Sequence, residues 1–231
     1  MRDMLLANAP FFLTLVTGSY LLGILIYRKS KFALLHPVIV SMIVIIAILK
    51  IFHIPYESFA AGSQLINFLL GPAVVALGVL LYDQLTYIKG NVISMLTAIS
   101  IGSVVGVASV ILIGKLMGLD ASLIHSLEPK SVTTPIAMGL SSSLGGNPSL
   151  TAVTVVICGI IGAIAGPIVH KLLRIKSPIA KGLSMGAAAH GLGTAKAMEI
   201  GALEGAISGL SIGLMGIMTS IAIPVVHWLL G

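Results

Sequence analysis

Six stretches of the sequence are apolar enough and long enough to cross a lipid bilayer. They are residues 11–27, 38–54, 65–82, 92–117, 149–170 and 205–229. A bilayer core of about 30 Å needs roughly 20 apolar residues per helix. Only 9% of the residues are charged, whereas a soluble domain carries about 25%. The sequence therefore predicts an all-α integral membrane protein with about six transmembrane helices, the first of them retained and not a signal peptide.

Two further segments, 118–148 and 171–204, fit neither lipid-facing helices nor solvated loops. They are too rich in Gly, Pro and Ser for the first and too apolar for the second. Irregular backbone is tolerated at membrane depth only where protein or a water-filled cavity surrounds it. Each segment is therefore predicted to be a re-entrant or broken-helix element.

The net charge of +6 comes from basic residues that gather in two places. One is RKSK (28–31), and the other follows residue 170, with Lys171, Arg174, Lys176 and Lys181. Such clusters are typical of cytoplasmic loops in membrane proteins, so we do not expect nucleic-acid binding. Both clusters lie on the cytoplasmic side if 128–146 enters and leaves the membrane from one face.

The chain contains nearly the same octapeptide twice. TPIAMGLS (134–141) precedes a long apolar stretch that ends in IAGPIVHKLL (164–173), and SPIAKGLS (177–184) precedes one that ends in IAIPVVHWLL (221–230). Because both ends match in order, we predict an inverted repeat, the architecture that many secondary transporters use. Residues 1–117 would then form a four-helix scaffold, and 118–231 a substrate core made of the repeats 128–173 and 177–230.

The first polar cluster, residues 128–149, has the chemistry of an anion site. Pro129 and Pro135 interrupt helices, and a helix start with free N–H groups attracts anions. Hydroxyl, amide and ammonium groups surround this start; the candidates are Lys130, Ser131, Thr133, Thr134 and Asn147. The alternative is that the hydroxyls only satisfy the broken backbone and that the Lys130 side chain extends to water.

The second cluster, residues 186–205, places ionisable groups in an apolar half of the chain, where they are costly and functional by default. His190 stands beside Gly191, which leaves room for a ligand, and Thr194 follows. His190, Glu199 and Glu204 are candidates for proton coupling. Alternatively, His190 is a neutral imidazole that donates to a backbone carbonyl, and Lys196 pairs with Glu199 across one helical turn.

Several other classes of site are not expected. The single Cys158 forms no disulfide framework, and neither HExxH nor a Cys–His metal spacing occurs, so no metal or other cofactor is predicted. GLGT (191–194) follows no strand and is not a dinucleotide fingerprint. The remaining histidines stand at predicted helix ends: His36, His53, His125, His170 and His227. No nucleophile, base and orienting group combine, so we expect no enzyme.

Long and unusual motifs carry a family resemblance. PKSVTTPIA (129–137), LGGNPSLTA (144–152), AAAHGLGTAKAMEIGALEGAISGL (187–210) and LLGPAVVALGVLLYDQL (69–85) resemble the LrgB/CidB family of bacterial membrane proteins. The family is described as antiholin-like, or as modulators of murein hydrolase activity and autolysis, usually paired with a small holin-like LrgA/CidA-type partner. Plastid relatives look like glycolate/glycerate translocators, and some bacterial members are associated with pyruvate movement. One departure is Met138–Leu140, where several relatives have a more acidic stretch.

The resemblance implies a bacterial cytoplasmic membrane protein and a binding site for a small carboxylate. The implied site residues are Lys130, Ser131, Thr133, Thr134, His190, Gly191 and Thr194. Our first hypothesis is a transporter or facilitator of small monocarboxylates such as pyruvate, glycolate or glycerate. Its core would move against the N-terminal helices in an elevator-type cycle, and those helices would form a homodimer interface. The alternative is an antiholin-like interaction protein that regulates a holin-like partner and cell lysis.

Overall fold

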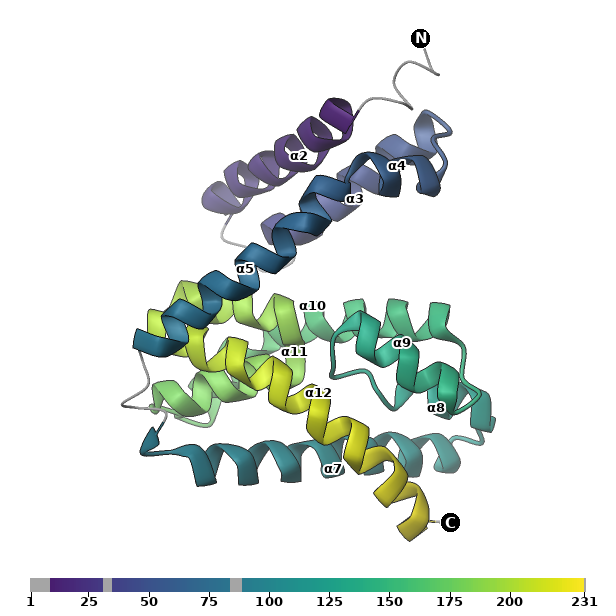
Figure 1. The fold of residues 1–231 in the computed structure, drawn as a ribbon, viewed down its shortest axis with the longest axis vertical. Helices are drawn as coiled ribbons and strands as arrows, with labels where there is room; N and C mark the ends of the chain where they lie inside the picture. The colour runs from purple at the N-terminus through teal and green to yellow at the C-terminus, as the bar shows by residue number, and fades with distance from the viewer. Residues whose placement is uncertain (1–8, 31–34, 84–88, 231) are drawn as a thin grey trace. The chain divides into compact units, whose positions relative to one another are not determined.

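A computed structural model describes residues 9–30, 35–83 and 89–230, so Lys31 of the predicted basic loop lies outside the described residues. The chain forms two compact units, Met1–Ala76 and Leu77–Gly231. Within the described ranges the regular elements are all α-helices (Figure 1). The long helix α7 therefore belongs to the same compact unit as the repeat. The functional division at residue 117 into scaffold and core stays a prediction.

The first unit contains α2 (Ala9–Ser30), α3 (Pro37–Ile51), α4 (Tyr56–Gly62) and the first part of α5 (Gln64–Asp83). The hydroxyl oxygens of Ser19 and Ser41 lie 2.9 Å apart and join α2 to α3. Phe12 is fully buried and makes an edge-on ring contact with Phe59 of α4. Such ring pairs stabilise a core beyond the area that they bury, so this unit has a small core of its own.

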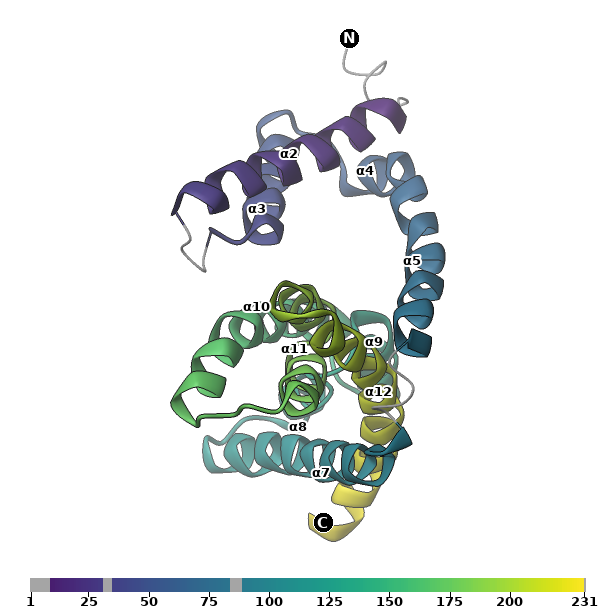
Figure 2. The same cartoon turned by 90° about the vertical axis from the view of Figure 1, so that its left-hand side faces the viewer.

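The second unit is built around α11 (Pro178–Ile200). This helix packs against α7 (Val92–Leu116), α10 (Pro148–Leu172) and α12 (Ala202–Leu230), as Figure 2 shows. The short helices α8 (Ala121–Leu127) and α9 (Thr134–Ser143) pack on α10. Small residues allow this close approach: a methyl group added at Gly186 of α11 would collide with the backbone of Ser208 in α12. The candidate site is therefore held by closely packed helices.

The two copies of the octapeptide take equivalent places in the fold. The first begins α9, whose N-cap residue is Thr133, and the second begins α11, whose N-cap Ser177 accepts a hydrogen bond from the N–H of Ala180. A proline in each copy occupies the first turn, where its missing N–H is tolerated. The long helices α10 and α12 that complete the repeats both carry an internal proline. The order of elements matches the predicted repeat, and the inverted orientation of its halves stays a prediction.

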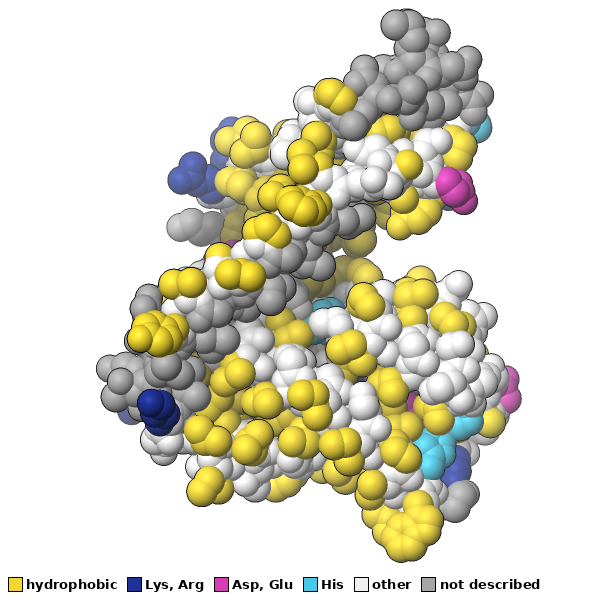
Figure 3. Space-filling model, viewed as in Figure 1, with side chains coloured by type: hydrophobic (Ala, Val, Ile, Leu, Met, Phe, Trp, Pro, Cys, Tyr) yellow, Lys and Arg dark blue, Asp and Glu magenta, His cyan; other side chains and the backbone are white. Residues whose placement is uncertain are grey.

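Each of the six apolar stretches predicted from the sequence coincides with a helix. In the described part of the chain four helices are long and apolar enough to cross a membrane: Pro10–Ser30, Val92–Leu116, Pro148–Leu172 and Ala202–Leu229. Helix α3 has 15 residues, and the number of spans stays a prediction. Figure 3 shows hydrophobic side chains across the visible faces of these helices. This is the surface expected of an all-α membrane protein.

Candidate functional site

The turn before α9 holds most of the first predicted cluster. Lys130, Ser131, Thr133 and Thr134 are all half-buried there. Thr133 stands at the N-cap position but makes no capping hydrogen bond with its side chain. Within the described ranges the hydroxyls of Ser131, Thr133 and Thr134 form no hydrogen bond. Since the first N–H groups of a helix also lack intrahelical partners and carry partial positive charge, this turn offers donors to an anion.

A buried network of hydrogen bonds joins α8, α9 and α10. The hydroxyl of Thr151 lies 2.9 Å from the Ser126 carbonyl oxygen and 2.8 Å from the Ser141 hydroxyl, and Ser126 accepts the N–H of Asn147 at 2.7 Å. The side-chain oxygen of Asn147 accepts the N–H groups of Ser149 and Leu150 and so caps α10. These bonds satisfy the irregular backbone, a role that the alternative interpretation gave to the hydroxyls of this cluster and that Asn147 shares. Its contact with a substrate stays a prediction.

Helix α11 is broken at His190, which confirms the broken helix predicted for this segment. His190 has φ 39° and ψ −125° and is 8% exposed. These angles are close to those at the first central position of a type II′ turn, which glycine normally occupies. The ring atom Nε2 lies 3.0 Å from the carbonyl oxygen of Val155 in α10. A carbonyl only accepts, so Nε2 donates, which is the hydrogen bond to a backbone carbonyl that the alternative interpretation of His190 expected.

The other candidates of the second cluster lie along the C-terminal arm of α11 and the start of α12. The hydroxyls of Thr194 and Ser208 are 2.8 Å apart and buried. Lys196 Nζ donates to Glu199 Oε2 at 2.6 Å near the surface, so the predicted pair is confirmed. Glu204 is buried in the first turn of α12, where a carboxylate interacts favourably with the helix dipole. Gly191 is exposed, and nothing surrounds the position of an added methyl group.

A hollow of about 480 Å³ lies beside the second octapeptide and the turn before α9. Ser131 lines it from the turn before α9, and Ser184 lines it from the second octapeptide. The rest of the wall is mostly apolar and comes from α7, α11, α12 and the loop before α11: Ala98, Ile99, Gly102, Ile175, Ala180, Leu183, Ala187, Ala188 and Met215. An apolar hollow with a few polar groups is the usual form of a small-molecule site. Among the predicted binding residues, Ser131 is the one that lines this hollow.

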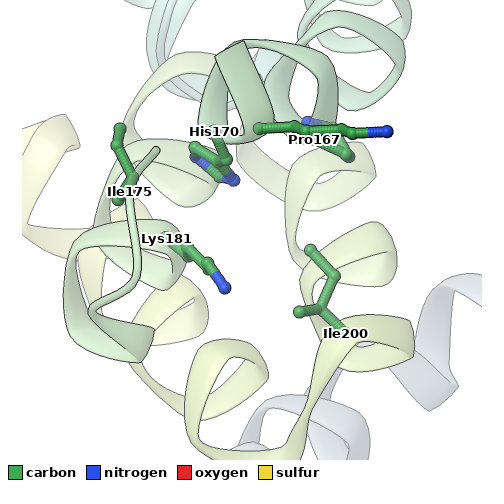
Figure 4. A pocket seen from close by; sticks show the side chains of 6 residues that line it. Pro167, His170, Ile175, Lys181 and Ile200 are labelled. Carbon is green, nitrogen blue, oxygen red and sulfur yellow. The ribbon is translucent and has the colours of Figure 1, made fainter. Parts of the chain in front are cut away.

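A second hollow, of about 360 Å³, carries positive charge. His170, Lys171 and Lys181 line it together with Pro167, Ile175 and Ile200, and the side chains of His170, Lys181 and Ile200 point into the same space (Figure 4). His170 Nε2 lies 2.8 Å from the Ser184 hydroxyl. Because Ile175 lines both hollows and Ser184 lines the larger one, the two are neighbours. The sequence did not single out this basic hollow as a binding surface.

The sequence patterns also did not predict a third group of polar side chains that lie together. His125 of α8 and His227 of α12 both contact the buried carboxylate of Glu128. The two histidines were expected only at helix ends. A signal for them existed in the repeat, since His170 and His227 occupy equivalent positions near the ends of the two long helices. What the sequence does not contain is the contact between Glu128 and His227, which are separated by 99 positions.

These observations define an all-α integral membrane protein in which helix α11 is broken at His190. The chain belongs to the LrgB-like family, whose model matches residues 15–229. It is 39% identical over 221 residues to the uncharacterized protein YxaC of Bacillus subtilis (strain 168), which covers 96% of both chains. It is 36% identical over 207 residues to the antiholin-like protein LrgB of Bacillus cereus (strain B4264), covering 89% of this chain and 90% of that protein. No solved structure matches the chain.

Proposed function

We propose that this protein transports small monocarboxylates of the pyruvate, glycolate and glycerate class across the bacterial cytoplasmic membrane. The observation that carries the proposal is the turn before α9. Three hydroxyls without hydrogen bonds in the described structure, those of Ser131, Thr133 and Thr134, stand there beside Lys130 and the start of a helix. Oriented donors and positive charge at a helix start favour a carboxylate. A site for a cation would instead present carbonyl and carboxylate oxygens.

The larger hollow suits the rest of such a substrate. Ser131 connects the donor-rich turn to a wall that is mostly apolar. A small carboxylate has one charged end and a short carbon chain, so it can place the charge at the turn and the carbon atoms against the apolar wall. Ser184 of the second octapeptide would complete the site from the opposite half of the repeat.

The basic hollow would serve as the approach to this site. Lys171 and Lys181 line the basic hollow together with His170, whose ring contacts Ser184 in the wall of the larger hollow. Clustered positive charge raises the local concentration of anions. The break at His190 lies in the helix that lines both hollows, and hinges at such breaks allow helix segments to move separately. Protonation of His190, Glu199 or Glu204 would couple proton movement to this motion of the helix segments.

A second candidate function comes from the names of similar proteins. Antiholin-like protein LrgB of Bacillus cereus is similar over nearly its whole length. By this similarity the chain would act in the control of murein hydrolase activity and autolysis, with a small holin-like membrane partner. Carboxylate flux and lysis control are compatible, since transport can influence autolysis indirectly. The two functions differ in whether the chain alone moves a selected solute.

Matched variants in proteoliposomes test the transport proposal. Thr134→Val removes a hydroxyl that is open to a ligand, whereas Thr154→Val removes one that bonds to the Leu150 carbonyl within α10. Hydrogen bonds to charged groups contribute about 1.5–3 kcal/mol, so Thr134→Val should weaken pyruvate uptake about 10- to 150-fold and Thr154→Val should not. His190→Ala should also abolish uptake while the protein still inserts into the membrane.

A charge-matched pair completes the comparison. Lys130→Gln and Lys196→Gln each remove one positive charge, but Lys196 is paired with Glu199 near the surface. We expect loss of uptake only for Lys130→Gln. Wild-type uptake that persists in Lys130→Gln, Thr134→Val and His190→Ala would overturn the site, and absence of wild-type uptake would overturn the function.

A further inference from the structure

Glu128 is a buried carboxylate held between two histidines. Its Oε1 lies 3.1 Å from Nδ1 of His125, and its Oε2 lies 2.9 Å from Nε2 of His227. The Glu128 side chain is 0% exposed, whereas those of His125 and His227 are 21% and 33% exposed. The two imidazole rings are 5.2 Å apart between centroids. The three side chains therefore converge from α8, from the residue that follows α8, and from the last turn of α12.

Burial of this carboxylate requires polar partners that replace water. A buried ionised group without a partner is strongly destabilising. Among the described residues the ion-pair partners of Glu128 are the two histidines, and each carboxylate oxygen faces one ring nitrogen. Two arrangements can satisfy the carboxylate: hydrogen bonds from the two imidazole rings, or a cation held by all three side chains. The distances of 2.9 and 3.1 Å fit hydrogen bonds as they stand, and a shared cation requires small movements of the same three side chains.

We propose that His125, Glu128 and His227 bind a divalent transition-metal ion of the zinc class. Their ligand atoms all lie within 4.8 Å of one another. Ligands about 2.0–2.2 Å from a tetrahedral zinc ion lie roughly 3.3–3.5 Å apart, so small side-chain movements bring all three into place. Two imidazoles and one carboxylate suit zinc, cobalt or nickel. Magnesium and calcium prefer oxygen ligands throughout.

The surroundings also fit a bound metal. Three protein ligands leave a fourth position for water, which is common in zinc sites. The partial exposure of both histidines provides access for the ion, and histidine side chains are visible at the surface beside the C-terminal part of α12 (Figure 3). The site differs from the proposed carboxylate site in both its residues and its chemistry.

A metal here would join distant parts of the chain. His227 lies 99 positions after Glu128, and Glu128 is followed within three residues by Lys130 and Ser131. The ion would therefore fasten the end of α12 to the turn that begins the candidate carboxylate site. Metal occupancy would stabilise the second unit and restrict the movement of that turn.

Titration of the full-length protein in detergent tests the proposal after chelation has removed bound metal. Wild-type protein should bind one equivalent of Zn²⁺ per chain, and Co²⁺ should give the visible absorption of a tetrahedral site. A hundredfold excess of Zn²⁺ over its Kd should raise the unfolding midpoint by about 5–10 °C. Mg²⁺ at the same concentration should not raise it.

Variants assign the ligands. Loss of a residue that merely hydrogen-bonds to a metal ligand costs about 10–100-fold in metal affinity. Loss of a ligand itself should cost at least as much. His227→Ala and the nearly isosteric Glu128→Gln should therefore each weaken Zn²⁺ binding at least tenfold. His170→Ala, at the equivalent place in the first repeat, should bind as wild type does. Three results would overturn the proposal: no saturable binding by wild type, equal binding by wild type and Glu128→Gln, or equal stabilisation by Zn²⁺ and Mg²⁺. The Glu128→Gln comparison remains decisive if His227→Ala does not fold.

Discussion

Replacement of His190 by glycine should give a more stable protein than replacement by alanine. Both variants lose the imidazole and its hydrogen bond to the Val155 carbonyl, so their difference reports the backbone alone. With φ 39° and ψ −125°, residue 190 has a conformation that costs a residue with a Cβ atom about 1–3 kcal/mol. Glycine adopts it without this penalty.

The expected magnitude follows from two opposing effects. Glycine relieves about 1–3 kcal/mol of strain but loses about 0.5–1 kcal/mol more conformational entropy than alanine on folding. The glycine variant should therefore be more stable by about 1 kcal/mol, which corresponds to about 2–4 °C in unfolding midpoint for a chain of this size. At an ordinary helical position the order is the reverse, and glycine costs about 1 kcal/mol relative to alanine.

Thermal unfolding of the purified protein in detergent measures this difference. Ala195→Gly serves as the matched control, because Ala195 lies in the same helix and outside its non-helical residue. We expect Ala195→Gly to lower the unfolding midpoint relative to wild type. We expect the midpoint of His190→Gly to be higher than that of His190→Ala. If His190→Ala is the more stable of the two, the break at His190 is not a backbone constraint and the reasoning fails.

Three further predictions concern packing and capping, each measured by unfolding midpoint. A methyl group at Gly159 would lie 2.6 Å from Cε1 of His190, so Gly159→Ala should destabilise the protein. A methyl group at Gly213 would meet no neighbour, so Gly213→Ala should stabilise the protein by up to about 1 kcal/mol. A midpoint for Gly159→Ala at or above wild type would contradict this packing. Thr151→Val leaves the Ser126 carbonyl and the Ser141 hydroxyl without their partner and should destabilise the protein by about 1–3 kcal/mol. An unchanged stability would mean that water replaces the hydroxyl. Asn147→Ala should destabilise the protein by about 0.5–2 kcal/mol because the side-chain cap of α10 is lost. Asn147→Asp should keep the cap and the stability. An equal loss of stability in both variants would argue against the cap.

The helices were predictable because the signals for them are local. Residues 149–170 predicted a helix that the structure extends to Pro148–Leu172, and 205–229 predicted one that runs from Ala202 to Leu230. Apolar length alone fixes such elements. Pro129 and Pro135 predicted an interrupted helix in the first cluster, and α9 begins at Thr134. The octapeptide match predicted a repeat, and its second copy begins α11.

The tertiary contacts were not predictable, because no local pattern contains them. The segment 171–204 indicated a break, but the position of that break at His190 depends on packing against α10, including the hydrogen bond to Val155. Residue preferences would have favoured Gly191 for the unusual backbone, not the histidine before it. The contacts of Glu128 with His125 and His227 likewise need the fold to bring α8 and α12 together. Departures from local preference concentrate at functional positions, which makes both places worth testing.

Uptake of labelled pyruvate by proteoliposomes that contain only this protein, with and without a pH gradient, tests the transport account most directly. The account predicts uptake that saturates, that unlabelled glycolate and glycerate reduce by competition, and that is absent from protein-free liposomes. Leakage of pyruvate at the same rate as an uncharged sugar, or no uptake by correctly inserted protein, would contradict it.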